Sequence, residues 1–238
     1  MGKSLIITGA DFSVNGMPPE FQALDWIGVS TNHLSYISSG IRLKATTKFY
    51  MDFTTVAVDS SFPNSSSRGL YLGAMTNNYS VLNLWFQASI NNGNVVQRLS
   101  VGYGNTEGSP AHWKEISLSI LDGNRHTLEV TPSGYTFDGA TTAWADSTWG
   151  INEGSGGNPV FYLDASSTYN APTDDSRFAT RGDFVRIHRF KIYEGNTIVF
   201  DAIPVTRVAD GKVGYYDYVS GEYKFRNDNT VPSNSNNP

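Results

Sequence analysis

The 238-residue chain contains no cysteine and few charged residues, and both scarcities limit what it can be. Without cysteine it has neither disulfides nor thiolate metal or redox sites. Charged residues make up 16% of the chain, the net charge is −5, and lysine and arginine do not cluster. Because a phosphate backbone is held by concentrated positive charge, this pattern argues against nucleic-acid binding.

Long apolar segments are also absent. No run approaches the roughly 20 residues of a membrane-spanning helix, and the start, MGKSLIITG, lacks the apolar length of a signal peptide. Low charge, abundant Asn, Ser and Thr, and a polar VPSNSNNP end favour an extracellular or cell-surface protein whose export signal is not in this chain. We expect one domain over residues 1–230 and a flexible tail over 231–238.

The common catalytic motifs are missing as well. The sequence has no Gly-x-Ser-x-Gly, no His-Glu-x-x-His, no P-loop and no dinucleotide-binding fingerprint. Its four histidines are isolated from one another in the sequence, and they are His33, His112, His126 and His188. Two of them, His126 and His188, fall inside expected strands, where a hydrogen-bonded, half-buried histidine is the simpler interpretation. The sequence therefore predicts a protein that is not an enzyme.

Short β-rich segments fill the chain instead. Runs of β-branched and aromatic residues alternate with turns rich in Gly, Asn and Ser, as in antiparallel strands joined by tight turns. The expected strands are Ser4–Ile7, Trp26–Val29, Ile41–Ala57, Leu70–Ala74, Val81–Ala88, Val95–Tyr103, Ile116–Leu121, His126–Thr131, Gly134–Phe137, Val185–Tyr193, Ile198–Val205 and Val213–Phe225. About a dozen strands without a linker predict an all-β fold of two packed antiparallel sheets.

Two features refine this prediction. His126–Thr131 alternates, Pro132-Ser133-Gly134 turns the chain, and Tyr135-Thr136-Phe137 returns, which predicts a hairpin. Long loops are expected near 64–67 and over 144–183, where Gly, Asn, Ser, Asp and Pro are concentrated.

The segments RHTLEVTPSGYTFDG and RIHRFKIYEGNTIVFDAIPVTRVADGKVGYYDYVSGEYKF resemble the concanavalin A-like lectin/glucanase superfamily. They are most similar to laminin-G-like modules of secreted bacterial proteins of the Bacteroidetes type, as is the opening SLIITGADFSVNGM. The resemblance implies a jelly-roll β-sandwich whose curved face or loop rim binds glycans. Its motifs are structural, so they bear on the fold more than on the function.

The same superfamily includes glucanases that carry Glu-x-Asp-x-x-Glu on one strand, which sets two carboxylates about 5 Å apart across the sugar. None of the seven glutamates of this chain has an aspartate two positions later. This absence argues against that catalytic site.

Aromatic side chains and amides are the groups that would hold a sugar, by stacking and by hydrogen bonds. In Val81–Gln87 the alternation sends Asn83, Trp85 and Gln87 to one face, so a tryptophan stands between two amides. The other candidates are aromatic residues in or beside loops: Tyr103 and Trp113 around the 104–112 loop, and Trp144 and Trp149 in the long loop. For each tryptophan a structural role in the core or rim is the alternative, and Trp26 is assigned to the core.

A calcium site is a weaker expectation. Asp164, Asp174 and Asp175 lie in a loop rich in oxygen donors, and the resemblance implies a calcium ion at the sandwich rim. The alternative is a solvated acidic loop, because the spacing matches no calcium-binding loop.

The preferred hypothesis is a non-catalytic carbohydrate-binding module that binds a polysaccharide or host glycan. The first alternative is a structural or adhesion module of a surface or phage-tail protein that binds a protein partner. A divergent glycoside hydrolase is the last.

Overall fold

The computed structural model describes residues 16–28, 37–42, 44–55, 122–144 and 185–225 with their side chains. It describes five further segments, 67–76, 79–91, 94–103, 112–116 and 160–165, as backbone strands. All regular secondary structure in these described ranges is β-strand. Within them no helix has the length and apolar character to cross a membrane.

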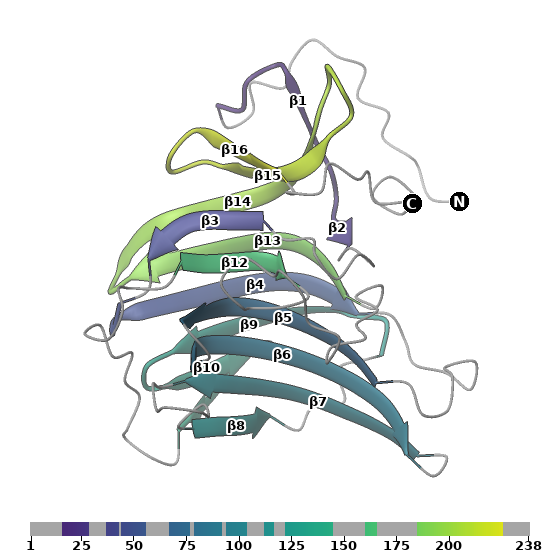
Figure 1. Cartoon of the computed structure of the whole chain (residues 1–238), viewed down its shortest axis with the longest axis vertical. Helices are drawn as coiled ribbons and strands as arrows, with labels where there is room; N and C mark the ends of the chain where they lie inside the picture. Colours follow the sequence, from purple (N-terminus) through teal and green to yellow (C-terminus); the bar gives the residue numbers. More distant parts are fainter. Residues whose placement is uncertain are drawn as a thin grey trace.

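Two antiparallel sheets make up the fold (Figure 1). The larger sheet has ten strands, with eight in the order β11-β10-β9-β4-β13-β14-β15-β16 and with β1 and β2 paired to β14 and β13. Its strands are β1 (Phe21–Ala23), β2 (Ile27–Gly28), β4 (Thr47–Thr55), β9 (Arg125–Thr131), β10 (Gly134–Phe137), β11 (Ala140–Ala143), β13 (Val185–Glu194), β14 (Thr197–Arg207), β15 (Val213–Asp217) and β16 (Glu222–Phe225).

The smaller sheet has six strands in the order β3-β12-β5-β6-β7-β8. They are β3 (Ile37–Arg42), β12 (Val160–Ala165), β5 (Ser67–Thr76), β6 (Tyr79–Asn91), β7 (Asn94–Tyr103) and β8 (His112–Ile116). The predicted all-β, two-sheet antiparallel sandwich is thus confirmed.

A strict two-residue alternation builds the core side of the ten-stranded sheet. Along β4 every second residue is buried, from Thr47 to Thr55, and the residues between them are partly exposed. The side chains with no exposed surface include Phe49, Met51 and Phe53 of β4, Leu128 and Val130 of β9, Phe190 and Ile192 of β13, Phe200 of β14 and Tyr215 of β15. Removing this apolar layer from water stabilises the fold.

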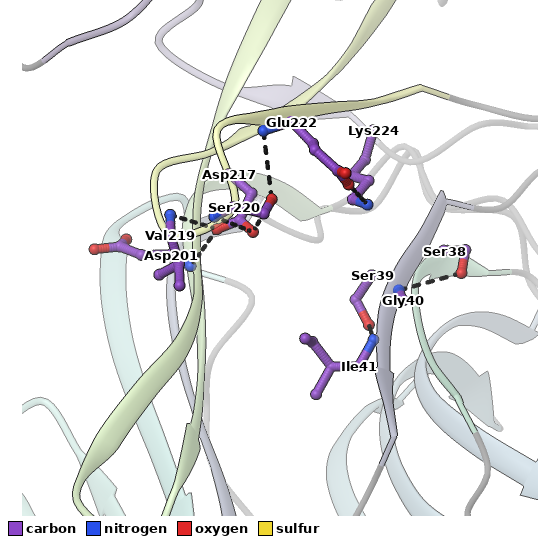
Figure 2. A network of polar contacts seen from close by, with 10 residues as sticks. All are labelled: Ser38, Ser39, Gly40, Ile41, Asp201, Asp217, Val219, Ser220, Glu222 and Lys224. Carbon is purple, nitrogen blue, oxygen red and sulfur yellow. Dashed lines mark hydrogen bonds and ion pairs between the residues drawn. The ribbon is translucent and has the colours of Figure 1, made fainter.

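Strand β3 shows which face of the six-stranded sheet points toward the larger sheet. Ile37 is fully buried and Ser39 is 2% exposed. Figure 2 shows Ser39 and Ile41 on the side of β3 toward β14 and β15, and Ser38 on the opposite side. The Ser38 side of β3 is therefore the face turned away from the larger sheet.

The end of the ten-stranded sheet is held by Asp217, which is 2% exposed (Figure 2). Its carboxylate accepts hydrogen bonds from the backbone N–H of Asp201 at 2.9 Å and of Val219 at 3.1 Å. It also accepts from the N–H and the hydroxyl of Ser220, at 3.2 and 2.7 Å. One side chain thus fixes both β14 and the turn between β15 and β16.

The predicted hairpin over 126–137 is confirmed as β9 and β10. A second, unpredicted hairpin follows, because Asp138 and Gly139 have φ angles of +46° and +82°. Positive φ at both central residues defines a type I′ turn, which suits a two-residue hairpin, and it leads into β11.

Other predicted boundaries were wrong. The single strand predicted over 41–57 is divided between β3 and β4, because a turn intervenes. In this turn Thr47 N–H donates to the Lys44 carbonyl at 2.9 Å, and Lys44 N–H donates to Thr47 Oγ1 at 2.7 Å. The long loop over 144–183 contains β12. The strand expected over 116–121 begins earlier, as β8, and residues 117–121 lie outside the described ranges, as does the expected strand over 4–7.

Candidate functional site

Backbone pairing carries one row of residues across the whole six-stranded sheet. Ser38 of β3 pairs with Tyr162 of β12, which pairs with Gly73 of β5. The row continues through Asn83 of β6 to Gly102 of β7 and Trp113 of β8. Directly paired residues share a face of the sheet, so these positions lie on the outward face that Ser38 defines.

A second and a third row run parallel to the first, two residues further along each strand. The second row pairs Trp85 with Tyr71 and with Ser100, which pairs with Glu115. The third pairs Gln87 with Gly69 and Arg98. We call the three rows the Trp85 face: Ser38, Tyr162, Gly73, Asn83, Gly102 and Trp113; Tyr71, Trp85, Ser100 and Glu115; Gly69, Gln87 and Arg98.

The remaining positions of these strands are mainly apolar. Alternation places Leu72, Leu84 and Val101 on the same face as Ile37, toward the ten-stranded sheet. The separation of apolar and polar positions is the pattern of a sheet with one face on the core and the other available to a ligand.

The composition of the Trp85 face fits a sugar ligand. Aromatic rings stack on the apolar face of a pyranose, and amide, carboxylate and guanidinium groups bind its hydroxyls. Tyr162 and Trp113 stand four strand spacings apart, ~19 Å, with Asn83 between two glycines in the middle of their row.

Four of the residues predicted from the sequence share this face: Asn83, Trp85, Gln87 and Trp113. Tyr103, which was grouped with Trp113, pairs with Leu82 and His112 and therefore occupies the opposite face. The sequence showed that the two aromatics flank one loop, but the register decides which face each occupies.

Trp144 belongs to the other sheet. Its indole Nε1–H donates to the Thr131 carbonyl at 2.9 Å, and its ring lies 5.3 Å from that of Tyr135. These contacts hold the residue after β11 against the β9–β10 hairpin. Trp149 lies outside the described residues. Trp26 is 8% exposed, as its core assignment predicted.

For the expected calcium site, Asp164 lies in β12, and Asp174 and Asp175 fall outside the described residues. Where side chains are described, no group of three or more His, Cys, Asp or Glu is arranged to hold a metal ion.

Sequence reasoning missed two aromatic residues of the Trp85 face, Tyr71 and Tyr162. Tyr71 stands between Leu70 and Leu72, an alternation that already indicated a polar-side aromatic. Tyr162 lies in β12, which the surrounding loop composition concealed.

His126 and His188, the histidines whose side chains are described, are hydrogen-bonded, as predicted, and are more deeply buried than the predicted half-buried state. His188 is 8% exposed and lies at a bulge of β13, with Nδ1 2.7 Å from the Asp25 carbonyl and Nε2 2.8 Å from Thr54 Oγ1. Its ring joins the segment before β2 to β4.

His126 is 7% exposed and lies between two carboxylates. Nδ1 is 2.8 Å from Asp138 Oδ2 and Nε2 is 3.0 Å from Asp122 Oδ1, while the ring lies 5.0 Å from that of Phe137. Burial lowers the pKa of His126, but the hydrogen bonds to the two carboxylates outweigh burial and raise it above its ordinary value. This Asp–His–Asp group joins the start of β9 to the turn after β10, so its role is structural.

Comparisons with known proteins add little to this picture. No protein-family model matches the chain, and no curated protein matches it. A galectin from Caenorhabditis elegans aligns with a TM-score of 0.32 and 13% identity over 71% of this chain and 96% of the galectin. The enzymatically active domain of tailspike protein 2 of bacteriophage CBA120 aligns with a TM-score of 0.36 and 10% identity over 78% of this chain and 29% of that chain. At these values neither likeness supports an argument, so the β-sandwich assignment depends on this chain's own strand pairing, and membership of the concanavalin A-like superfamily stays a prediction.

Proposed function

We propose that the chain is a non-catalytic carbohydrate-binding module of an exported or cell-surface protein, and that it binds a polysaccharide or host glycan on the Trp85 face. The observation that supports this proposal is the register, which gathers Trp85, Tyr71, Trp113 and Tyr162 around Asn83 on the outward face. Four aromatic positions with amides between them match the groups that stack on pyranose rings and bind their hydroxyls.

Stacking and hydrogen bonds on one sheet face hold a sugar weakly at each single site. Useful affinity would then come from several sites acting together, or from attachment to a larger surface assembly.

A glycan array with labelled protein tests the proposal, in calcium and in chelator, beside Trp85→Ala. The matched control is Trp144→Phe, which removes the indole hydrogen bond to Thr131 from the other sheet but keeps a ring. We expect binding by the wild type and the control, and a loss of about tenfold or more in Trp85→Ala, because the ligand loses the ring on which it stacks. Loss with chelator alone would move the site to the Asp164–Asp175 region. No binding on the array by a folded protein would favour the structural or adhesion alternative.

A further inference from the structure

The middle of the ten-stranded sheet carries a group of two tyrosines and two lysines on its outward face. Tyr50 of β4 pairs with Lys191 of β13, and Lys48 of β4 pairs with Tyr193 of β13. The residues between them on each strand are fully buried in the core, so these four side chains lie on the opposite, partly exposed face. We call Lys48, Tyr50, Lys191 and Tyr193 the Tyr–Lys quartet.

Each lysine of the quartet lies over one of the aromatic rings. Lys48 Nζ is 5.5 Å from the centroid of the Tyr193 ring, and Lys191 Nζ is 5.9 Å from that of Tyr50. Cation–π attraction holds an ammonium at this distance while leaving its N–H donors available to an anion.

Neither ammonium has a close carboxylate of its own. Lys48 Nζ donates to Asn196 Oδ1 at 3.4 Å, and no described carboxylate lies within ion-pair distance of it. Lys191 Nζ is 3.7 Å from Asp201 Oδ2, but Arg189 Nη2 already donates to that oxygen at 2.7 Å and Arg189 Nε donates to the other at 2.7 Å. The charge of each of these two lysines is therefore incompletely neutralised.

Two glutamates lie beside the quartet. Glu129 of β9 is the backbone partner of Tyr50 of β4. Beyond the end of the quartet, Lys44 Nζ makes an ion pair of 2.6 Å with Glu194 Oε2. Burial, followed by nearby carboxylates, raises the pKa of Tyr50 and of Tyr193. Both phenols therefore stay protonated and can donate hydrogen bonds. Glu129 offers an acceptor for a hydroxyl.

We propose that the Tyr–Lys quartet is a second binding site, on the other sheet from the Trp85 face, for a carboxylate-bearing sugar such as a uronic acid. A uronic acid has a pyranose face that can stack on a tyrosine and, at the edge of the same ring, a carboxylate. The quartet offers, on adjacent strands, two tyrosine rings that each have an ammonium 5.5 to 5.9 Å from the ring centroid. The inference rests on the proposed function only in taking a saccharide as the ligand.

Calorimetry with trigalacturonic acid and with its fully methyl-esterified form tests this site, because esterification removes the charge and keeps the rings. We expect the acid to bind about tenfold more tightly than the ester, and its affinity to fall as salt is raised. The double variant Lys48→Gln/Lys191→Gln should lose this preference. Lys44→Gln is the control, since it removes one positive charge from a lysine already paired with Glu194.

The outcomes separate this inference from the proposed function. Equal binding of acid and ester, or an unchanged preference in the double variant, would overturn the second site even if neutral glycans bind in a Trp85-dependent way. Retention of acid binding in Trp85→Ala, with its loss in the double variant, would establish the quartet as a separate site. If neither probe binds and the glycan array is also silent, both proposals are wrong.

Discussion

The outward faces of the two sheets are built from different residues. On the ten-stranded sheet, opposite charges on neighbouring strands face one another: Arg125 makes two hydrogen bonds of 2.8 Å to Asp52, and Arg189 makes two of 2.7 Å to Asp201. The Trp85 face instead combines aromatic, amide and glycine positions with one glutamate and one arginine.

The difference indicates that substitutions on the two faces affect different properties of the protein. Paired charges satisfy one another within the sheet, and removing one partner of a partly buried pair leaves the other charge unpaired, which costs stability. Aromatic and amide positions on an outward face contribute little to the core, but they provide contact area for a ligand. Removing polar groups from the large sheet should therefore cost stability, whereas removing aromatics from the Trp85 face should cost affinity.

The largest effect on stability is expected at Asp217. Replacing it with alanine removes four hydrogen bonds from a side chain that is 2% exposed and leaves the buried Asp201 N–H without that acceptor. We expect a loss of about 3 kcal/mol in the free energy of unfolding, measured by urea denaturation. The control is Asp210→Ala, because Asp210 serves the exposed 207–212 turn. Similar losses in the two variants would contradict the view that the buried network holds this end of the sheet.

A smaller effect with a defined pH dependence is expected at His126. Its folded pKa is raised, so the stabilisation is fully present below the unfolded value of about 6.5 and is lost as the pH rises through the folded value. The pKa of Asp122 is lowered to about 2, since hydrogen bonds from the Asn124 N–H and from His126 outweigh burial, and its contribution is lost only as the pH falls toward that value.

Thermal unfolding between pH 5 and pH 9 checks the expected pH dependence of stability. The wild type should lose stability toward pH 9, and His126→Gln should be less stable at pH 5 by about 1.5 kcal/mol and show a flatter profile. His188→Gln is a useful comparison, because His188 bonds to a carbonyl and a hydroxyl and has one carboxylate, Asp25 Oδ1 at 3.3 Å from Nδ1, instead of two. A His126→Gln profile parallel to that of the wild type would show that the Asp–His–Asp group does not titrate with folding.

The sequence predicted the fold class well because strand patterns are local. The 126–137 hairpin follows from a period of two and from Pro132-Ser133-Gly134, which are visible in a dozen residues. The sequence did not predict the rows of the Trp85 face, because Tyr162 of β12 stands beside Gly73 of β5 and Ser38 of β3 through a register between segments far apart in the chain. A one-residue slip would exchange the faces of a strand, as the separation of Tyr103 from Trp113 illustrates. The Tyr–Lys quartet was missed for the same reason, since Lys48 and Tyr193 are 145 positions apart.

The smallest change in stability is expected for Trp113→Ala and Tyr162→Ala at the two ends of the first row. Both positions lie on the outward face, so we expect unfolding free energies within about 1 kcal/mol of the wild type. Binding of an oligosaccharide identified on the array should nevertheless weaken in both, because the ligand loses one stacking surface in each case. Leu84→Ala, on the core side of β6, is the opposite control and should cost about 3 kcal/mol. If Trp113→Ala destabilised the protein as much as Leu84→Ala, the outward face of the six-stranded sheet would be part of the core, and the contrast between its aromatic positions and the ion pairs of the larger sheet would fail.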